Sequence, residues 1–170
     1  MPTGLKQSSS VVPIGFNVTE TAANTFTQGS VDLNLSPLDR EVFVVLAINL
    51  DAQAPGLVAT QTTRVRGAFT TTSQTGMPTL SDSNCLSRIT LEAVSDASGA
   101  LAVPFQSQAL ETPPSTLEYI GIIATNDFFI QVQGTNNLNP KGLSGKVYGY
   151  RAVADASIYA ALVQSEVLSA

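Results

Sequence analysis

The chain has 170 residues, of which 13 are acidic, 8 are basic and none is histidine, so its formal net charge is −5. A length within the common range of about 100–200 residues predicts a single domain. Without histidine the chain lacks the usual general base and the commonest ligand of zinc, copper and haem iron, and its acidic balance disfavours nonspecific binding to nucleic acid.

Residues 1–10 form a Ser-rich arm that we expect to extend outwards or to dock on another surface. Residues 11–16 follow as a short edge segment, because Pro13 has no N–H to donate to a strand ladder. Residues 26–35 alternate between apolar and polar side chains, which predicts a half-buried strand that ends before Pro37.

Two longer strands are predicted next. Residues 41–51 are apolar on both faces, as expected of a strand that is covered on both sides. Residues 60–72 are rich in β-branched side chains and predict a strand with Arg64 and Arg66 on one face. A loop at residues 52–56 separates the two strands.

The middle of the chain is less regular. Residues 80–94 are ambiguous, because Ser81 is a suitable cap for a short helix while residues 88–94 alternate like a strand. We favour a turn followed by a strand. After a turn at residues 96–99, the prolines at positions 104, 113 and 114 predict an irregular connection with short extended pieces.

Two closely spaced strands are predicted at residues 117–125 and 128–133. Asn126 and Asp127 between them predict a tight hairpin, since both residue types tolerate the positive φ that such turns require. Residues 145–153 predict a final strand.

The chain is predicted to end in a helix. Asp155 is a suitable N-cap, and apolar residues recur after it at helical spacing, namely Ile158, Tyr159, Leu162, Val163 and Val167. We therefore divide the chain into an N-terminal arm (1–10), a β-sandwich domain (11–154) and a C-terminal helix (155–170). The predicted fold is an all-β antiparallel sandwich of jelly-roll type.

No catalytic, cofactor-binding or metal-binding residue is predicted, because the nucleotide-binding, zinc-binding and nucleophile-elbow motifs are all missing from the sequence. Arg64 and Arg66 are interpreted as exposed or interface arginines, with an anion site as the alternative. The lone Cys85 cannot form an internal disulfide and is interpreted as a small buried side chain, since no histidine is present to activate it.

Carboxylate chemistry leaves two alternatives. The acidic pairs closest in sequence are Asp39 with Glu41 and Glu111 with Glu118. Nearby prolines place them in loops or at strand ends, and sugar sites normally add aromatic platforms, which are scarce in a chain without tryptophan. Calcium held by loop carboxylates is the other alternative, although no Asp-x-Asp-x-Asp run occurs.

Uncharged polar residues dominate the hydrophilic part of the composition. Charged residues make up 12% of the chain, whereas Ser, Thr, Asn and Gln together number 54, and ordinary soluble domains carry about 25% charged residues. Hydroxyl and amide groups can form hydrogen bonds in many registers, while buried charges must be paired. The composition suits a protein whose faces meet copies of itself, and it equally suits a secreted β-domain.

In general character, residues 11–154 resemble small jelly-roll coat and decoration proteins of viruses, particularly of bacterial and archaeal viruses. The resemblance rests on the Ser-rich arm, the Thr- and Asn-rich strands, and the segments Tyr119-Ile-Gly-Ile-Ile-Ala-Thr125 and Phe128-Phe-Ile-Gln-Val-Gln-Gly-Thr-Asn136. It implies a virion protein, made in the host cytoplasm, that packs against itself or a second capsid protein. The short length and the lack of a basic arm favour a minor shell component or an outer layer away from nucleic acid.

Two other classes of structural protein fit the same features. One is a phage tail-tube subunit, and the other is an exported fibre or adhesin domain, which requires a removed leader. The N-terminus has no apolar run typical of a secretion signal, and no stretch approaches the roughly 20 apolar residues that span a bilayer. If the chain assembles, we expect deletion of residues 156–170 to abolish assembly and leave a folded β-domain, and Cys85→Ala to have no effect.

Overall fold

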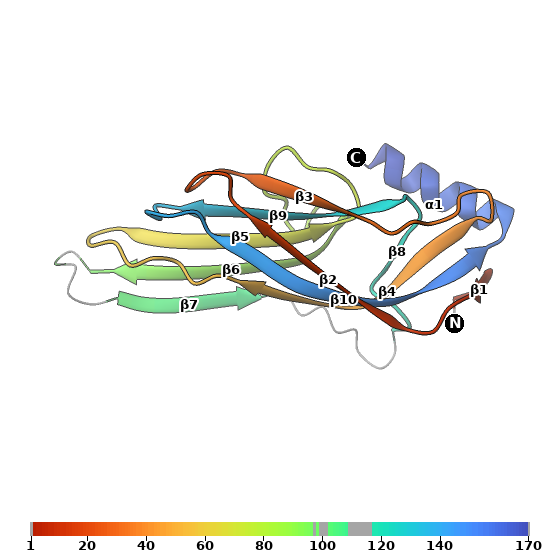
Figure 1. The fold of residues 1–170 in the computed structure, drawn as a ribbon, viewed down its shortest axis with the longest axis horizontal. Helices are drawn as coiled ribbons and strands as arrows, with labels where there is room; N and C mark the ends of the chain where they lie inside the picture. The colour runs from red at the N-terminus through yellow and green to blue at the C-terminus, as the bar shows by residue number, and fades with distance from the viewer. Residues whose placement is uncertain (1, 97, 99–101, 109–116, 170) are drawn as a thin grey trace.

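The computed structural model describes residues 2–96, 98, 102–108 and 117–169, which form two antiparallel β-sheets and one helix (Figure 1). The elements are β1 (Leu5–Gln7), β2 (Val12–Thr19), β3 (Thr27–Asp32), β4 (Glu41–Ala52), β5 (Thr62–Thr70), β6 (Cys85–Ser95), β7 (Ala102–Gln108), β8 (Gly121–Ile123), β9 (Asp127–Thr135), β10 (Gly142–Ala154) and α1 (Ala156–Leu168). Within the described residues, no helix is long and apolar enough to cross a membrane.

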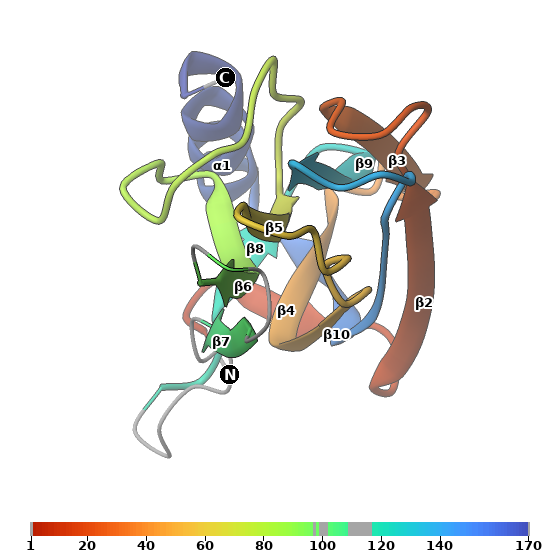
Figure 2. The same cartoon turned by 90° about the vertical axis from the view of Figure 1, so that its left-hand side faces the viewer.

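The strands form two five-stranded sheets. Sheet A has the order β1–β10–β4–β8, with β2 also paired with β10, and sheet B has the order β3–β9–β5–β6–β7. The two sheets form separate layers, and β3 and β7 lie at opposite borders of sheet B (Figure 2).

The strand pairing defines a jelly roll. β2 pairs with β10, β3 with β9, β4 with β8 and β5 with β6, so the first half of the chain pairs with the second half in nested order. Successive pairs alternate between sheets A and B, as in a ribbon wound into a jelly roll. The predicted antiparallel β-sandwich with a C-terminal helix is confirmed, whereas the expected extended arm is in part a strand, since Leu5–Gln7 form β1 of sheet A.

The inner core lies between the sheets around three phenylalanines. Phe16 of β2 contacts Phe69 of β5 and Phe128 of β9, with ring centroids 5.8 Å apart in both pairs. Phe69 and Phe128 stack at 4.6 Å. Because Phe16 belongs to sheet A and the other two rings belong to sheet B, this cluster holds the two layers together.

The first half of β4 is covered on both faces, as its sequence predicts, whereas Asn49 and Asp51 in its second half are exposed, contrary to the prediction. Its inner face contributes Phe43, Val45, Ile48 and Leu50 to the core between the sheets, and its outer face contributes Val42 and Val44 to a second apolar cluster. The inward-facing residues of β4 have odd numbers up to Val45 and even numbers from Ile48. The change occurs because the pairing with β10 shifts by one residue, so that no residue of β10 lies directly opposite Leu46.

Helix α1 packs on the outer face of sheet A. The predicted N-cap is confirmed, since Asp155 Oδ1 accepts a hydrogen bond from the backbone N–H of Ile158 at 2.8 Å. The apolar face of the helix packs on the second apolar cluster, which consists of Leu5, Val42, Val44, Ala124, Tyr150, Ala152 and Ala154. The prediction is wrong for Val167, which is 62% exposed, because Glu166 occupies the buried side of the last turn.

The N-terminal arm docks on its own chain. β1 pairs with the end of β10, where Leu5 lies opposite Ala154, and Leu5 is buried in the cluster beneath α1. The backbone N–H of Asp155 also donates to the carbonyl of Gly4 at 3.1 Å. The arm therefore helps to close the end of the molecule that carries the helix.

The predicted hairpin at Asn126 and Asp127 is wrong. The first strand shortens to β8, which pairs with β4 in sheet A, whereas β9 pairs in sheet B, so the short link between them crosses from one sheet to the other. Neither Asn126 nor Asp127 has a positive φ. The corner is held because the backbone carbonyl of Asn126 accepts from Leu33 N and its side-chain oxygen accepts from Leu35 N, both at 2.7 Å.

Residues 102–108, predicted to be an irregular connection with short extended pieces, form the longer strand β7. Pro104 lies within β7 opposite Ala93 of β6, and proline in a sheet is found mainly in strands at the border. The segment at residues 80–94 follows the favoured prediction of a turn and then a strand, but β6 begins at Cys85, earlier than predicted.

Candidate functional site

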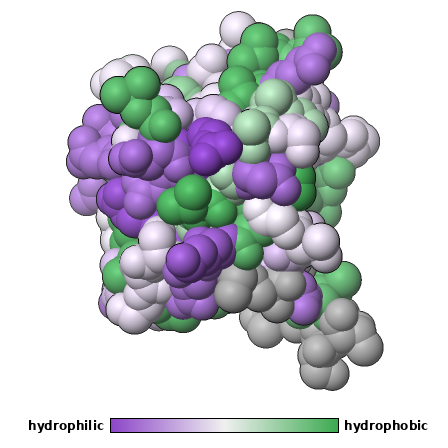
Figure 3. Space-filling view, turned by 90° about the vertical axis from the view of Figure 1, so that its right-hand side faces the viewer, coloured by the Kyte–Doolittle hydropathy of each residue, from purple (hydrophilic) through white to green (hydrophobic). Residues whose placement is uncertain are grey.

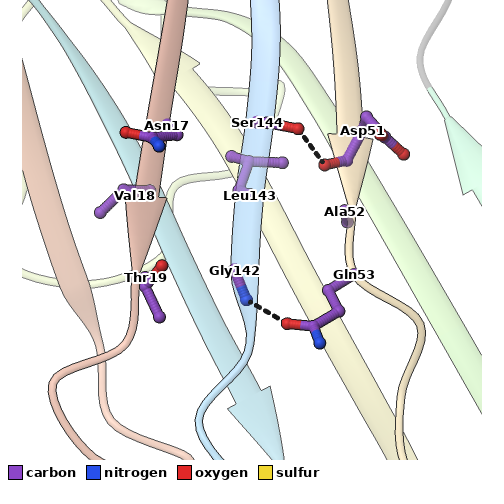
Figure 4. A pocket seen from close by; sticks show the side chains of 9 residues that line it. All are labelled: Asn17, Val18, Thr19, Asp51, Ala52, Gln53, Gly142, Leu143 and Ser144. Carbon is purple, nitrogen blue, oxygen red and sulfur yellow. Dashed lines mark hydrogen bonds between the residues drawn. The ribbon is translucent and has the colours of Figure 1, made fainter.

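A shallow polar groove crosses the part of sheet A that α1 leaves uncovered (Figure 4). It has a volume of about 360 Å³ and is lined by Asn17, Val18, Thr19, Asp51, Ala52, Gln53, Gly142, Leu143 and Ser144 of β2, β4, β10 and the residue that follows β4.

The polar groups of this groove bind mainly backbone. The side-chain oxygen of Gln53 accepts from Gly142 N at 3.1 Å, and the hydroxyl of Ser144 donates to the carbonyl of Asp51 at 3.5 Å. The carboxylate of Asp51 points away from Ser144 (Figure 4). The groove thus offers hydroxyl and amide groups for contact with another polar surface, and no nucleophile with an activating base.

An apolar groove follows the free border of sheet B. It has a volume of about 400 Å³ and is lined by Ala54, Pro55, Leu57, Leu91, Glu92, Ala93, Pro104, Phe105 and Gln106. Within it Leu57 is 71% exposed and Phe105 is 58% exposed, and Val103 beside them on β7 is 53% exposed. β7 therefore presents apolar side chains to solvent at this border, where β6 is its neighbour among the described strands.

Two buried carboxylates hold loops together. The two oxygens of Glu20 accept from the backbone N–H groups of Gly134 and Lys141 at 2.7 and 2.8 Å. The two oxygens of Glu166 accept from Ala124 N and Thr125 N, both at 2.9 Å. Both carboxylates act as fixed acceptors for backbone groups, which is a structural role.

Arg64 and Arg66 lie on the outer face of sheet B, on the same side of β5 as predicted. Arg64 forms an ion pair with Glu92 across β5 and β6 at 2.7 Å. Arg66 donates to the side-chain oxygen of Gln133 on β9 at 3.2 Å. Burial, together with the charges of Arg88 and Arg64, lowers the pKa of Arg66.

The two acidic pairs differ in how far the structure describes them. Asp39 accepts from the Ser36 hydroxyl at 2.8 Å, while Glu41 accepts from Arg151 at 3.0 Å. Glu111 lies outside the described residues. Glu118 is exposed, and the pKa of Tyr150 is raised by burial and by the charge of Glu118.

Cys85 is buried at the start of β6, where its thiol lies 3.5 Å from the carbonyl of Ser87. Among the residues that the structure describes, no three His, Cys, Asp or Glu side chains gather closely enough to hold a metal ion.

The β7 surface and the buried carboxylates were not predicted from the sequence. The alternation of Val103 and Phe105 around Pro104 is typical of an edge strand and is a signal that was available. No comparable signal exists for Glu20 or Glu166, because their partners are backbone N–H groups distant in the sequence.

Comparison with known proteins assigns no family. No protein-family model matches the chain, and no curated protein matches it. Among solved structures, a chain of desmodium yellow mottle tymovirus is similar, with 11% sequence identity and a TM-score of 0.32, and the match covers 92% of this chain and 96% of that one. The function of this chain therefore has to follow from its own residues and topology.

Proposed function

We propose that this protein is a non-enzymatic structural subunit that packs against copies of itself in a viral shell, as a capsid or capsid-decoration protein. The observation that carries this proposal is the pair of exposed apolar side chains Val103 and Phe105 on β7, at one border of the jelly roll, in a chain of which only 12% is charged.

The edge supports self-assembly on energetic grounds. Proteins that remain monomeric blunt the borders of their sheets with charges or proline, and β7 has proline at position 104, so its side chains rather than its backbone would make the contact. The side chains of β7 are uncharged, and Val103 and Phe105 are more than half exposed. Burying them against a neighbour would remove apolar area from water and so favour association.

The remaining surface is compatible with packing between subunits. At one end of the molecule, apolar side chains gather in small areas separated by polar ones (Figure 3). Interfaces between proteins have a similar mixture, with an apolar centre and a hydrogen-bonding rim. A non-enzymatic role is supported by the engagement of Glu20 and Glu166 with backbone groups, which leaves them no catalytic task.

The proposal is tested by measuring assembly of the purified chain with sedimentation velocity and negative-stain microscopy. We expect the wild type alone to form lattices or closed shells as its concentration rises. We expect Phe105→Glu to raise the concentration needed for assembly by about tenfold or more, as for a buried interface aromatic. Its thermal unfolding should not change, because Phe105 is 58% exposed.

The matched control is Leu38→Glu, which introduces the same charge at a residue that is 94% exposed in the loop between β3 and β4. A wild-type chain that stays monomeric at every concentration, or that hydrolyses a substrate, would overturn the proposal. Helical stacks or rings would favour a tail-tube subunit instead, and a monomer that binds glycans would favour a fibre or adhesin domain.

A further inference from the structure

The outer face of sheet B carries positive charge that the chain itself does not neutralise. Arg66 lies beside Arg64 on β5, and Arg88 projects from the neighbouring strand opposite Ala68. Glu92 pairs with Arg64, but among the described residues no carboxylate forms an ion pair with Arg66 or Arg88. The Nε groups of both arginines are buried without an acceptor.

The same face carries an unneutralised negative pair. Asp32 of β3 lies directly opposite Asp127 of β9 in the strand register, an arrangement of like charges that destabilises a sheet. Asp32 Oδ1 accepts from Asn34 N at 2.6 Å and from Asn126 Nδ2 at 2.7 Å, and both are uncharged donors. Within the described part of the chain, no cation pairs with either carboxylate.

The register gives the spacing between the two charged groups. Arg88 lies in the cross-strand row of Gln131, and Arg66 lies in the row of Gln133. Gln131 and Gln133 follow Asp127 along β9. At a rise of about 3.3 Å per residue, the rows of Arg88 and Arg66 are therefore roughly 13 and 20 Å from the acidic pair, measured along the strand.

A loop separates the arginines from the acidic pair. Gln74, between β5 and β6, donates its backbone N–H to Gln28 on β3 at 2.8 Å, in the row of Gln131. Because this loop crosses the face between the two charged groups, a flat contact over the whole face is obstructed. A head-to-tail contact, in which the arginines of one copy meet the carboxylates of the next, avoids the obstruction.

We propose that Arg66 and Arg88 bind the Asp32–Asp127 pair of a second copy of this chain in such a heterologous contact. Guanidinium groups bind carboxylates in bidentate geometry, and the contact would relieve the repulsion within both groups. Two arginines without an ion pair to the described residues are few compared with the roughly 6–10 phosphate contacts of a strongly salt-dependent nucleic-acid-binding protein. A heterologous contact repeats to build rings or extended lattices, so this inference rests on the proposed function and names one of its interfaces.

The test uses two charge-altered variants of the full chain. One is Arg66→Glu/Arg88→Glu, and the other is Asp32→Asn/Asp127→Lys, in which Asn keeps the side-chain oxygen that accepts from Asn34. We expect each variant alone to associate at least about tenfold more weakly than the wild type. An equimolar mixture should associate again, because the new Glu side chains of the first variant face the new Lys of the second, and the original arginines of the second variant face the original carboxylates of the first.

The matched control is Lys6→Glu/Lys146→Glu, which reverses two exposed positive charges on sheet A outside the polar groove and should associate like the wild type. If a charge-altered variant unfolds, Arg66→Gln/Arg88→Gln and Asp127→Asn replace the reversals and should weaken association without rescue on mixing. Wild-type assembly that none of these variants alters would overturn this interface and leave the proposed function intact. Binding of inorganic phosphate by a wild-type chain that never associates would overturn both.

Discussion

Among the described residues, Glu20 and Glu166 are the buried carboxylates, at 4% and 7% exposure. Each accepts two backbone hydrogen bonds and joins segments far apart in the sequence. Hydrogen bonds to a charged acceptor are stronger than neutral ones, and a buried N–H that loses its acceptor carries the full cost of its lost hydration. These two residues are therefore stabilising contacts within the loops and not sites of chemistry.

Removal of the Glu20 carboxylate should destabilise the fold. Glu20→Ala leaves the N–H groups of Gly134 and Lys141 without acceptors, so we expect a loss of about 2–4 kcal/mol in the free energy of unfolding. Glu20→Gln should lose less, because one amide oxygen remains as an acceptor. Urea denaturation measures both, and Asp51→Ala, at an exposed carboxylate, should change stability by less than about 0.5 kcal/mol. An equal effect of Glu20→Ala and Asp51→Ala would contradict the assigned role.

The helix cap predicts a dependence of stability on pH. The N–H of Ile158 and the hydroxyl of Ser157 donate to Asp155 and lower its pKa from its ordinary value. The stabilisation by the charged form is therefore complete above the pKa of the unfolded chain, about 3.9, and disappears as the pH falls through the lower pKa of the folded state. We expect Asp155→Asn, which keeps a capping oxygen, to lose less stability than the wild type between about pH 5 and pH 2. Urea midpoints at each pH measure this difference, and parallel curves would refute it.

At the scale of elements, α1 behaves as a lid on sheet A. Leu162 and Val163 pack on the cluster that contains Val42, Val44 and Tyr150. The sequence left open whether the helix covers the sandwich or packs between subunits, and its contacts favour the first. Deletion of residues 156–170 should consequently expose this cluster and lower the unfolding midpoint, rather than leave a stable β-domain as the sequence alone suggested.

Two alanine substitutions test which side of the helix is buried. Leu162→Ala removes a side chain packed against sheet A, and we expect a loss of about 2–3 kcal/mol in the free energy of unfolding. Val167→Ala alters a residue that is 62% exposed, so its effect should stay within about 0.5 kcal/mol. Thermal or urea unfolding compares the two variants directly. A larger effect at Val167 would mean that the helix is rotated relative to the structure described.

At the scale of the whole molecule, the phenylalanine cluster unites the two sheets. Phe16 lies in sheet A, and Phe69 and Phe128 lie in sheet B, with Phe69 and Phe128 fully buried. Close approach of the strands also requires glycine near this cluster, since a Cβ at Gly145 would lie 2.7 Å from the ring of Phe16 and would collide with the carbonyl of Asn49.

Substitution in this cluster should affect the stability of the whole fold. Phe69→Ala should cost about 3–5 kcal/mol, because the cavity it leaves is bounded by both sheets. Phe69→Leu retains most of the volume and should cost less. Phe105→Ala serves as a matched control at an exposed phenylalanine and should change the unfolding free energy of the dilute monomer by less than about 0.5 kcal/mol. Similar losses at Phe69 and Phe105 would contradict the assigned core.

Local patterns in the sequence predicted the elements that depend on neighbouring residues. Alternation placed Arg64 and Arg66 on one face, the apolar run at residues 41–51 identified a strand whose first half is covered on both faces, and Asp155 marked the start of the helix. These features follow from the period of side chains along a strand and from capping within one turn, and both are local properties.

The tertiary structure decided everything that depends on partners distant in the sequence. Asn126 and Asp127 resemble a hairpin turn, yet hydrogen bonds from Leu33 and Leu35 make the link cross between sheets. Glu166 takes the buried side of α1 in place of Val167 because the backbone N–H groups that Glu166 binds lie in the corner after β8.

The sequence by itself thus determined a jelly roll with a capped helix, low charge and no recognisable catalytic motif. The structure alone identified the exposed apolar side chains of β7 and the opposed charges of sheet B, because the make-up of a border or a charged patch depends on which strands become neighbours.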